Sequence, residues 1–218
     1  RANRLLGAKT AIVHGIPLRA SDFEAMRQAR TSLVWSPRSN IALYGQTADV
    51  GAALDAGVRV ALAPDWAVTG SSNLLEELHF AAQWNVEHLS SLLSDQQMVA
   101  MVTSIPAQIA GVDDEVGAIR PGLYADLLVI SGNRSVPARA MLEARAKDVQ
   151  LVLVGGQPLY GAPKLMERYW ERSELDAVNA GGAGKVVKLP ARVGRMRELE
   201  ARLQKALVAE GTQLTPSP

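Results

Sequence analysis

The chain has 218 residues, of which 48% are hydrophobic, so it is long enough for one large domain or two small ones. Its 23 lysines and arginines nearly balance its 22 aspartates and glutamates, which gives no electrostatic support for binding nucleic acid or a membrane. The absence of cysteine excludes disulfides and thiolate metal sites, and no apolar run approaches the roughly 18 residues of a membrane span. We therefore expect a cytoplasmic protein with neither nucleic-acid nor membrane partners.

The first hundred residues alternate strand signals with helix signals. Short apolar runs predict strands over residues 10–14, 32–35 and 58–63. Helical patterns follow over residues 21–30, 47–56 and 71–87, the last with Ser71 or Ser72 as its N-cap. Strands separated by helices are typical of parallel βα units, so we predict a parallel sheet that is too short to close into a barrel of eight strands.

Beyond residue 93 the pattern changes to one helix and then strands. The sequence Ser94-Asp-Gln-Gln97 predicts a capping box, and Pro106 should kink or end the helix that it opens. Strands are predicted over residues 125–130, 149–154 and 157–160, with Gly155-Gly156 as a hairpin turn. The Gly/Ala-rich residues 179–184 are interpreted as a linker, and an amphipathic helix with a balanced charged face is expected before Gly211.

Polar residues follow each of the three predicted parallel strands. His14 ends the first strand, Ser36-Pro-Arg-Ser-Asn40 follows the second as a loop, and Asp65 follows the third. Because the carboxyl ends of parallel strands share one face, these side chains should converge on one pocket. A histidine and an aspartate there suit general acid–base catalysis or two positions in a metal site.

Each candidate also has a purely structural interpretation. His14 could be a hydrogen-bonded core histidine, Asp65 a capping acid, and Arg38 and Asn40 loop residues that bind the backbone. Trp66 stands beside a candidate catalytic residue. Four other residues, Trp35, Trp84, His79 and His88, are expected by default to pack or to lie on the surface.

Five motifs in order resemble the amidohydrolase superfamily, in its cytosine-deaminase and chlorohydrolase-like branch. The resemblance covers roughly residues 8 to 165. The motifs are Ile12-Val-His-Gly15, Val34-Trp-Ser-Pro-Arg-Ser-Asn40, Ala63-Pro-Asp-Trp66 with Gly70 to Leu78, Glu115 to Ile130, and Val149 to Tyr160.

This resemblance implies an α/β fold: the last three βα units of a TIM-like (β/α)8 barrel, strands six to eight, over residues 1–110. C-terminal strands of a small β-sandwich would follow over residues 111–165, and a tail with an amphipathic helix over residues 166–218.

The family carries one divalent metal, zinc in the first instance or iron, at the mouth of the barrel. By resemblance, Asp65 contacts the metal and moves a proton, and His14 orients the metal-activated water or contacts the small-molecule substrate. Trp35, Arg38, Asn40 and Trp66 would bind the substrate.

The sequence also departs from the family pattern. The other metal ligands, a His-x-His pair and a later histidine, have no counterpart here, and two ligands are fewer than the three that catalytic zinc typically needs. Trp66 stands where many relatives have glycine. Since Arg1–Gly7 contains neither a starting methionine nor a signal-peptide core, we expect the C-terminal part of a longer enzyme, inactive alone.

The expected partners are the missing N-terminal half, in the same or another chain, and further copies in a homo-oligomer. The alternative hypothesis is a non-catalytic half-barrel scaffold that pairs with another chain through its exposed sheet edge. A small Rossmann-like binding protein is a weaker alternative, because no Gly-x-Gly-x-x-Gly follows any predicted strand.

Overall fold

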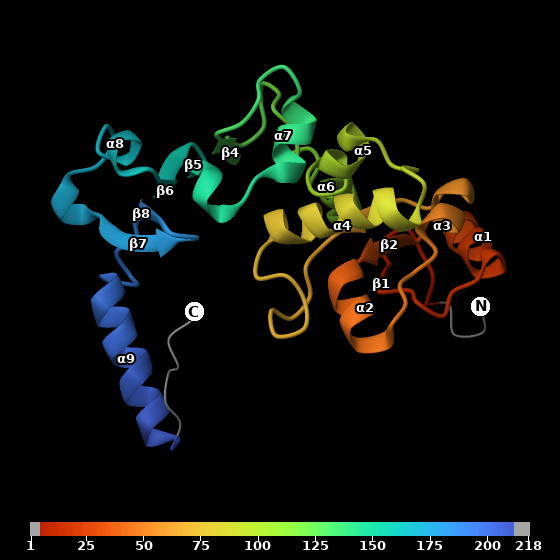
Figure 1. Cartoon of the computed structure of the whole chain (residues 1–218), viewed down its shortest axis with the longest axis horizontal. Helices are drawn as coiled ribbons and strands as arrows, with labels where there is room; N and C mark the ends of the chain where they lie inside the picture. Colours follow the sequence, from red (N-terminus) through yellow and green to blue (C-terminus); the bar gives the residue numbers. More distant parts are fainter. Residues whose placement is uncertain (1–4, 212–218) are drawn as a thin grey trace.

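The computed structural model describes residues 5–211 and contains two separate β-sheets with helices around them. Figure 1 shows the sheets towards opposite ends of the molecule, with helix α9 projecting from the C-terminal one. Residues 1–4, which are part of the N-terminal stretch used in the sequence interpretation, lie outside the described part. Across residues 5–211 no helix is both long and apolar enough to cross a bilayer.

The N-terminal sheet has three parallel strands, as the alternation of strand and helix signals predicts. The strands are β1 (Ala11–Val13), β2 (Ser32–Trp35) and β3 (Val60–Leu62), in the spatial order β1-β2-β3. Val13 pairs with Val34, and Trp35 pairs with Leu62. All three strands therefore end at the same edge of the sheet, where parallel α/β folds place their functional residues.

The helices that connect these strands are α1 (Ala20–Ala29), α2 (Pro37–Tyr44) and α3 (Val50–Asp55). The sequence prediction of a loop over residues 36–40 is wrong, because Pro37 occupies the first turn of α2 and Gly45 ends the helix with a left-handed φ of 67°. Proline is favourable at a helix start, since its fixed φ suits the first turn and that position has no intrahelical partner for an N–H. Arg38 and Asn40 therefore lie on a helix.

Helix α4 (Leu74–His88) crosses the parallel sheet region and is capped by Asn73, not by Ser71 or Ser72 as predicted. The predicted capping box at Ser94 is present and opens α5 (Asp95–Ala100). The chain then breaks and resumes as α6 (Ser104–Ala110), so Pro106 lies in the first turn of a new helix, where it is tolerated.

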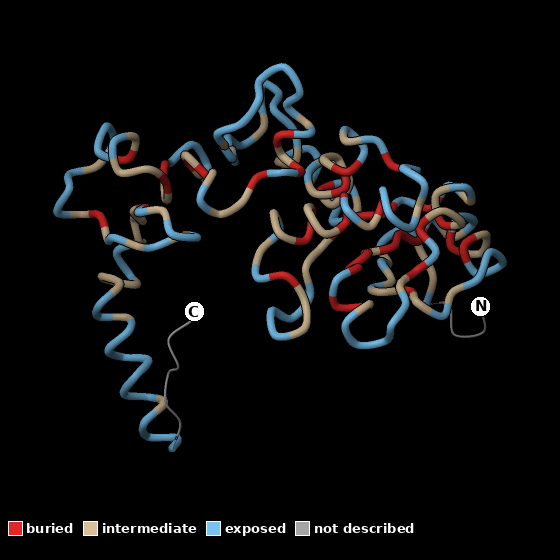
Figure 2. Tube along the Cα trace, viewed as in Figure 1, coloured by how far each residue is buried: buried red, intermediate tan, exposed pale blue. Residues whose placement is uncertain are grey.

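The main hydrophobic core lies between the parallel sheet and these helices, where Figure 2 shows most of the buried segments. Phe23, Leu33, Trp35 and Leu78 are among its most deeply buried members. Burial falls across the sheet: β3 is buried at all three positions, whereas β1 exposes its first and last residues. The edge of the sheet at β1 is therefore open to solvent.

The C-terminal sheet is antiparallel, with the strand order β4-β5-β6-β8-β7. Its strands are β4 (Leu127–Ile130), β5 (Val149–Val154), β6 (Gln157–Gly161), β7 (Asp176–Ala180) and β8 (Ala183–Val187). Short helical segments lie between these strands: α7 (Pro137–Glu143) and η1 (Ala146–Asp148) between β4 and β5, and α8 (Pro163–Met166) and η2 (Arg172–Glu174) between β6 and β7.

The hairpin at Gly155-Gly156 is confirmed, and both glycines have positive φ. The linker predicted over residues 179–184 is wrong, because these residues form the tip of the β7–β8 hairpin, where Gly181 and Gly182 again take positive φ. The region 166–218 thus contributes two strands to the sheet as well as the predicted helix.

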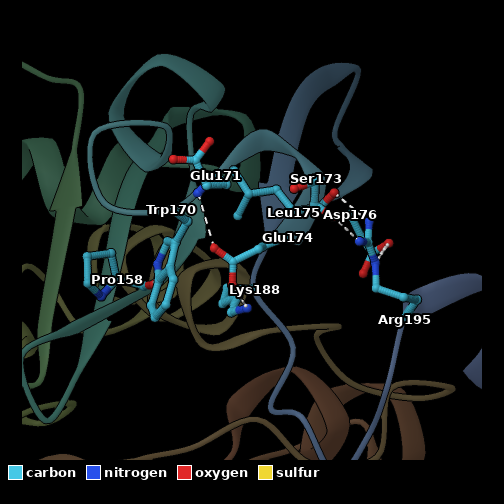
Figure 3. Close-up of polar contacts among 9 residues, drawn as sticks. All are labelled: Pro158, Trp170, Glu171, Ser173, Glu174, Leu175, Asp176, Lys188 and Arg195. Atoms are coloured by element: carbon cyan, nitrogen blue, oxygen red, sulfur yellow. Dashed lines mark hydrogen bonds and ion pairs between the residues drawn. The ribbon is translucent and has the colours of Figure 1, made fainter.

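Helix α9 (Met196–Ala209) has no buried residue and is joined to the sheet at its first residues. Figure 3 shows this junction: the Arg195 guanidinium forms an ion pair with Asp176 at 2.9 Å and donates to the backbone oxygens of Ser173 and Leu175. In the same view Lys188 pairs with Glu174 at 2.8 Å, and the Trp170 indole N–H donates to Pro158 O. Polar contacts, rather than apolar packing, therefore attach α9.

Candidate active site

The ends of β1 and β3 bring His14 and Asp65 together, as their positions in the sequence predict. His14 Nε2 lies 3.8 Å from Asp65 Oδ2, and the two side chains are 34% and 33% exposed. This separation is too long for a direct hydrogen bond, but both groups can reach a third atom held between them. The pair therefore forms an open site at the carboxyl edge of the parallel sheet.

The backbone at His14 has an uncommon conformation for a residue other than glycine. Its φ is 69°, and a hydrogen bond of 2.9 Å from Gly15 N to Val13 O closes a γ-turn around it. Glycine suits the next position, because Gly15 has a φ of 64° and a Cβ there would come within 2.6 Å of Leu33 Cδ1. Non-glycine residues held at positive φ concentrate at functional sites, which agrees with a role for His14.

Asn40 also belongs to this site, in contact with His14. Its side chain is completely buried, and its Nδ2 lies 2.9 Å from His14 Nδ1. On its other side, Asn40 Oδ1 accepts a hydrogen bond of 3.1 Å from Thr47 Oγ1. Asn40 thus supports the histidine from behind and has no exposed surface with which to contact a substrate.

Trp35 lies in the hydrophobic core, with no exposed surface. Its indole N–H donates to Thr47 Oγ1 at 2.8 Å. The expectation that Trp35 binds substrate does not fit this position, and the default interpretation of core packing describes it better. Strand β2 ends here, and the pleat turns the Trp35 side chain to the covered face of the sheet.

The segment after Asp65 is a tight turn that leaves Trp66 at the surface. Gly70 N donates to Trp66 O at 2.8 Å, and a Cβ on Gly70 would approach that oxygen to 3.2 Å. Trp66 is 67% exposed, directly beside Asp65 in sequence. Thr69 Oγ1, in the same turn, is buried without a hydrogen-bond partner within residues 5–211.

Arg38 and two glutamates of α4 form a second set of contacts near Asp65. Arg38 Nη1 lies 3.8 Å from Glu76 Oε2 on the surface, while the backbone N–H of Arg38 donates to Glu77 Oε1 at 3.2 Å. Glu77 is completely buried, and its Oε2 also accepts a hydrogen bond of 2.5 Å from Ser71 Oγ. Burial raises the pKa of the Glu77 carboxyl, although these two hydrogen bonds partly oppose that rise.

The buried carboxyl of Glu77 was not predicted from the sequence. The spacing of Glu77, Leu78 and Ala81, all of which are buried, is the signal that could have placed it on the inner face of α4.

The two other histidines are structural, as the sequence indicates. His79 Nδ1 lies 3.1 Å from Leu142 O, and His88 packs on the ring of Trp84 with centroids 3.8 Å apart. Over residues 5–211 no group of three histidine, aspartate or glutamate side chains is placed to hold a metal ion. His14 and Asp65 therefore supply at most two ligands from this part of the chain, fewer than a catalytic zinc site needs.

Comparison with known proteins shows the family of this chain. Residues 3–159 match the family model described as the Amidohydrolase family. Among curated relatives, the 5-methylthioadenosine/S-adenosylhomocysteine deaminase of Pyrococcus furiosus is 29% identical over 163 residues, which are 70% of this chain and 38% of the relative.

Two solved structures share the fold at low identity. A zinc-bound adenosine deaminase from Xanthomonas campestris superposes with a TM-score of 0.63 at 22% identity, covering 71% of this chain and 37% of that protein. The atrazine chlorohydrolase of Arthrobacter aurescens, in complex with zinc, gives a TM-score of 0.60 at 22% identity, covering 70% and 36%. The chain thus spans less than two fifths of the length of each of these proteins.

Proposed function

Because this chain belongs to the amidohydrolase family, we propose that it forms the C-terminal part of a metal-dependent hydrolase of the deaminase type. In this proposal β1, β2 and β3 are strands six, seven and eight of a (β/α)8 barrel, and the antiparallel sheet is part of a β-sandwich. The observation that carries the proposal is the approach of His14 to Asp65, at 3.8 Å, where parallel strands end on one face.

The two side chains have complementary chemistry. A carboxylate can accept a proton from an attacking water, and an imidazole N–H can donate a hydrogen bond to the substrate atom on which charge develops. His14 Nε2 and Asp65 Oδ2 are far enough apart for both to contact an atom that lies between them. Asp65 is therefore proposed as the proton-transfer group, and His14 as the group that positions the reacting atoms.

The metal is proposed to be a single divalent ion, zinc in the first instance and iron as the alternative. Asp65 would be one ligand, and the others would come from a segment N-terminal to this chain, because residues 5–211 do not form a complete site. A divalent ion bound there supplies Lewis-acid activation. The side chains of His14 and Asp65 are 34% and 33% exposed, so such a segment could reach them.

The substrate is proposed to be a small molecule whose carbon–nitrogen bond, or carbon–chlorine bond, is hydrolysed. Trp66, which is 67% exposed beside Asp65, offers a flat apolar surface on which an aromatic heterocycle can stack. Arg38 lies exposed at the start of α2 and can contact polar substituents. Asn40 acts through His14, since it has no exposed surface.

Metal content and turnover test the proposal directly. We expect the 218-residue chain to bind zinc weakly and to show no turnover, whereas a version extended N-terminally binds about one metal per active site. Ammonia release from amino-heterocycles and metal analysis by mass spectrometry are the measurements. Stoichiometric, tight zinc in the 218-residue chain would contradict the fragment hypothesis.

The second candidate function is a non-catalytic scaffold, and the exposed β1 edge favours it. Ala11 and Val13 of this strand are exposed, and unpaired strand edges bind other strands. In the hydrolase proposal this edge pairs with the N-terminal half, and homo-oligomers form in addition. Light scattering and metal analysis distinguish the two functions. The scaffold would be favoured if the protein forms a metal-free homo-oligomer and shows no activity after the N-terminal half is added. Both proposals place the protein in the cytoplasm, as its lack of cysteine suggests.

A further inference from the structure

We propose that Trp35 and Thr47 are positioning residues which, through Asn40, hold the His14 imidazole in the tautomer with its proton on Nε2. The inference rests on the proposed function, because it assigns a role to residues behind His14. The observation behind it is a continuous series of hydrogen bonds from Trp35 Nε1 to Thr47 Oγ1, on to Asn40 Oδ1, and from Asn40 Nδ2 to His14 Nδ1.

The series begins at a group that can act only as a donor. An indole N–H has no acceptor function, so at 2.8 Å from Trp35 Nε1 the Thr47 oxygen must accept. Trp35 is fully buried within the hydrophobic core, which prevents the ring from turning away. The single hydroxyl proton of Thr47 is then available for Asn40 Oδ1, at 3.1 Å.

The orientation of the Asn40 amide determines which group faces the histidine. With its oxygen accepting from Thr47, the amide presents its NH₂ group to His14 Nδ1 at 2.9 Å. The reversed amide would leave the Thr47 proton without this acceptor, and it would place a carbonyl oxygen against Nδ1. Asn40 is fully buried, and its backbone N–H is bound to Ser36 O, so the side chain is held in place.

A neutral imidazole carries one N–H, so a ring whose Nδ1 accepts has its proton on Nε2. Nε2 is the atom that lies 3.8 Å from Asp65 Oδ2. The donor is thereby directed into the open site before anything binds there. With the other tautomer, a nitrogen lone pair would face the Asp65 carboxylate, and the site would lose a hydrogen-bond donor.

The four residues come from different parts of the fold: the end of β1, the end of β2, the first turns of α2, and the segment between α2 and α3. The γ-turn at His14 sets the backbone, and the hydrogen bonds set the ring. Such support of a functional histidine from behind its ring is expected where catalysis depends on one tautomer.

Two-bond ¹H–¹⁵N correlation spectra of the ¹⁵N-histidine-labelled 218-residue chain test the inference, at a pH above about 8 where an ordinary imidazole is neutral. Only three histidines are present, and the variant carrying His79→Gln and His88→Gln isolates the signal of His14. We expect His14 in the Nε2–H tautomer. An Nδ1–H tautomer in the unaltered network would overturn the inference without any further variant.

Thr47→Val removes the hydroxyl at nearly constant shape, and Thr47→Ser is the matched control that keeps it. We expect Thr47→Val to populate the Nδ1–H tautomer and to shift the Trp35 indole N–H signal, with Thr47→Ser close to the original protein. An unchanged His14 tautomer in Thr47→Val would remove Thr47 from the series. An unchanged indole signal would remove Trp35.

These spectra need neither metal nor substrate, so they separate the two proposals. A tautomer that responds to Thr47→Val, in a protein whose N-terminally extended version lacks activity, would leave this inference standing and would overturn the hydrolase proposal. An active extended enzyme in which Thr47→Val changes neither tautomer nor kcat would do the reverse. In the active enzyme we expect Thr47→Val to lower kcat by about tenfold with little change in KM.

Discussion

In the parallel region, fully buried side chains such as Phe23, Leu33 and Trp35 form one large cluster, whereas the cluster of the antiparallel region contains three buried residues, Leu151, Met166 and Leu175. Polar contacts also contribute in the antiparallel region. The buried Lys185 ammonium, for example, donates to Val149 O at 2.6 Å. The two sheets therefore differ in the size of the apolar cluster that packs against them.

The difference bears on function, because His14 and Asp65 lie on the densely packed region. A reactive side chain works best when the residues behind it are locked by packing and hydrogen bonds. Asn40, which is completely buried, provides this support to His14, and the equally buried Glu77 joins Ser71 to the start of α2. The exposed helix α9 illustrates the opposite case, since polar contacts at its first residues attach it.

The largest expected effect is on kcat, and it should arise in the parallel region but not in the antiparallel region. In the N-terminally extended protein, Asp65→Asn should lower kcat by about 10²–10⁴-fold, because the amide cannot take a proton. Asp126→Asn is the matched control in the antiparallel region, where Asp126 Oδ1 accepts from Gly155 N. Steady-state kinetics should show little change for this control. Retained kcat in Asp65→Asn would remove Asp65 from proton transfer.

The next largest effect concerns packing. Phe23→Ala should lower the free energy of unfolding by about 3–5 kcal/mol, because it opens a cavity at a site with no exposed surface. Leu175→Ala in the smaller cluster should cost about 2 kcal/mol, at the low end for such truncations. Urea denaturation followed by circular dichroism measures both. Equal costs would argue against the difference in packing between the two regions.

The two regions should also respond to pH in opposite directions. The pKa of Glu77 is raised by burial, so the folded protein favours its protonated form; the stability this contributes is present below pH 4.5 and is lost as pH rises through the raised value. Desolvation raises the pKa of Asp176, but hydrogen bonds from Met196 N and Arg195 outweigh it and lower the pKa overall. Its contribution is present above pH 3.8 and is lost as pH falls through the lowered value.

Chemical denaturation across the acid range checks both signs. Glu77→Gln should match the original protein at low pH and gain stability relative to it as pH rises. Asp176→Asn should be less stable than the original protein near neutral pH and should converge on it in acid. A Glu77→Gln variant whose difference from the original protein does not vary with pH would show that this carboxyl does not titrate as the structure indicates.

The smallest expected effect is on stability, when the hydroxyl groups of Thr69 and Ser71 near the site are removed in turn. Thr69 Oγ1 is buried without a partner within residues 5–211, so Thr69→Val should be neutral or stabilising by up to about 1 kcal/mol. Ser71→Ala should instead destabilise by about 1–3 kcal/mol, because it leaves the buried Glu77 carboxyl short of a hydrogen bond. Thermal unfolding distinguishes them. A clear loss of stability in Thr69→Val would mean that its hydroxyl has a partner.

Local patterns in the sequence predicted much of the fold. The alternation of apolar runs and helical stretches predicted the parallel sheet, and the capping box at Ser94 and the turn at Gly155-Gly156 lie where expected. At two other places the sequence prediction missed a helix-start or turn signal. Pro37 is a helix start rather than part of a loop, and Gly181-Gly182 is a second hairpin turn rather than a linker.

The sequence by itself determined which residues end the parallel strands, and hence that His14 and Asp65 share one face, because parallel strands place their carboxyl ends at the same edge. Only the tertiary structure decided what lies behind them. Whether Trp35 faces a pocket or the core, and which group meets Asn40 or Glu77, depends on helices that pack from elsewhere in the chain. Burial and hydrogen-bond partners arise from that packing, and no pattern along the chain specifies them.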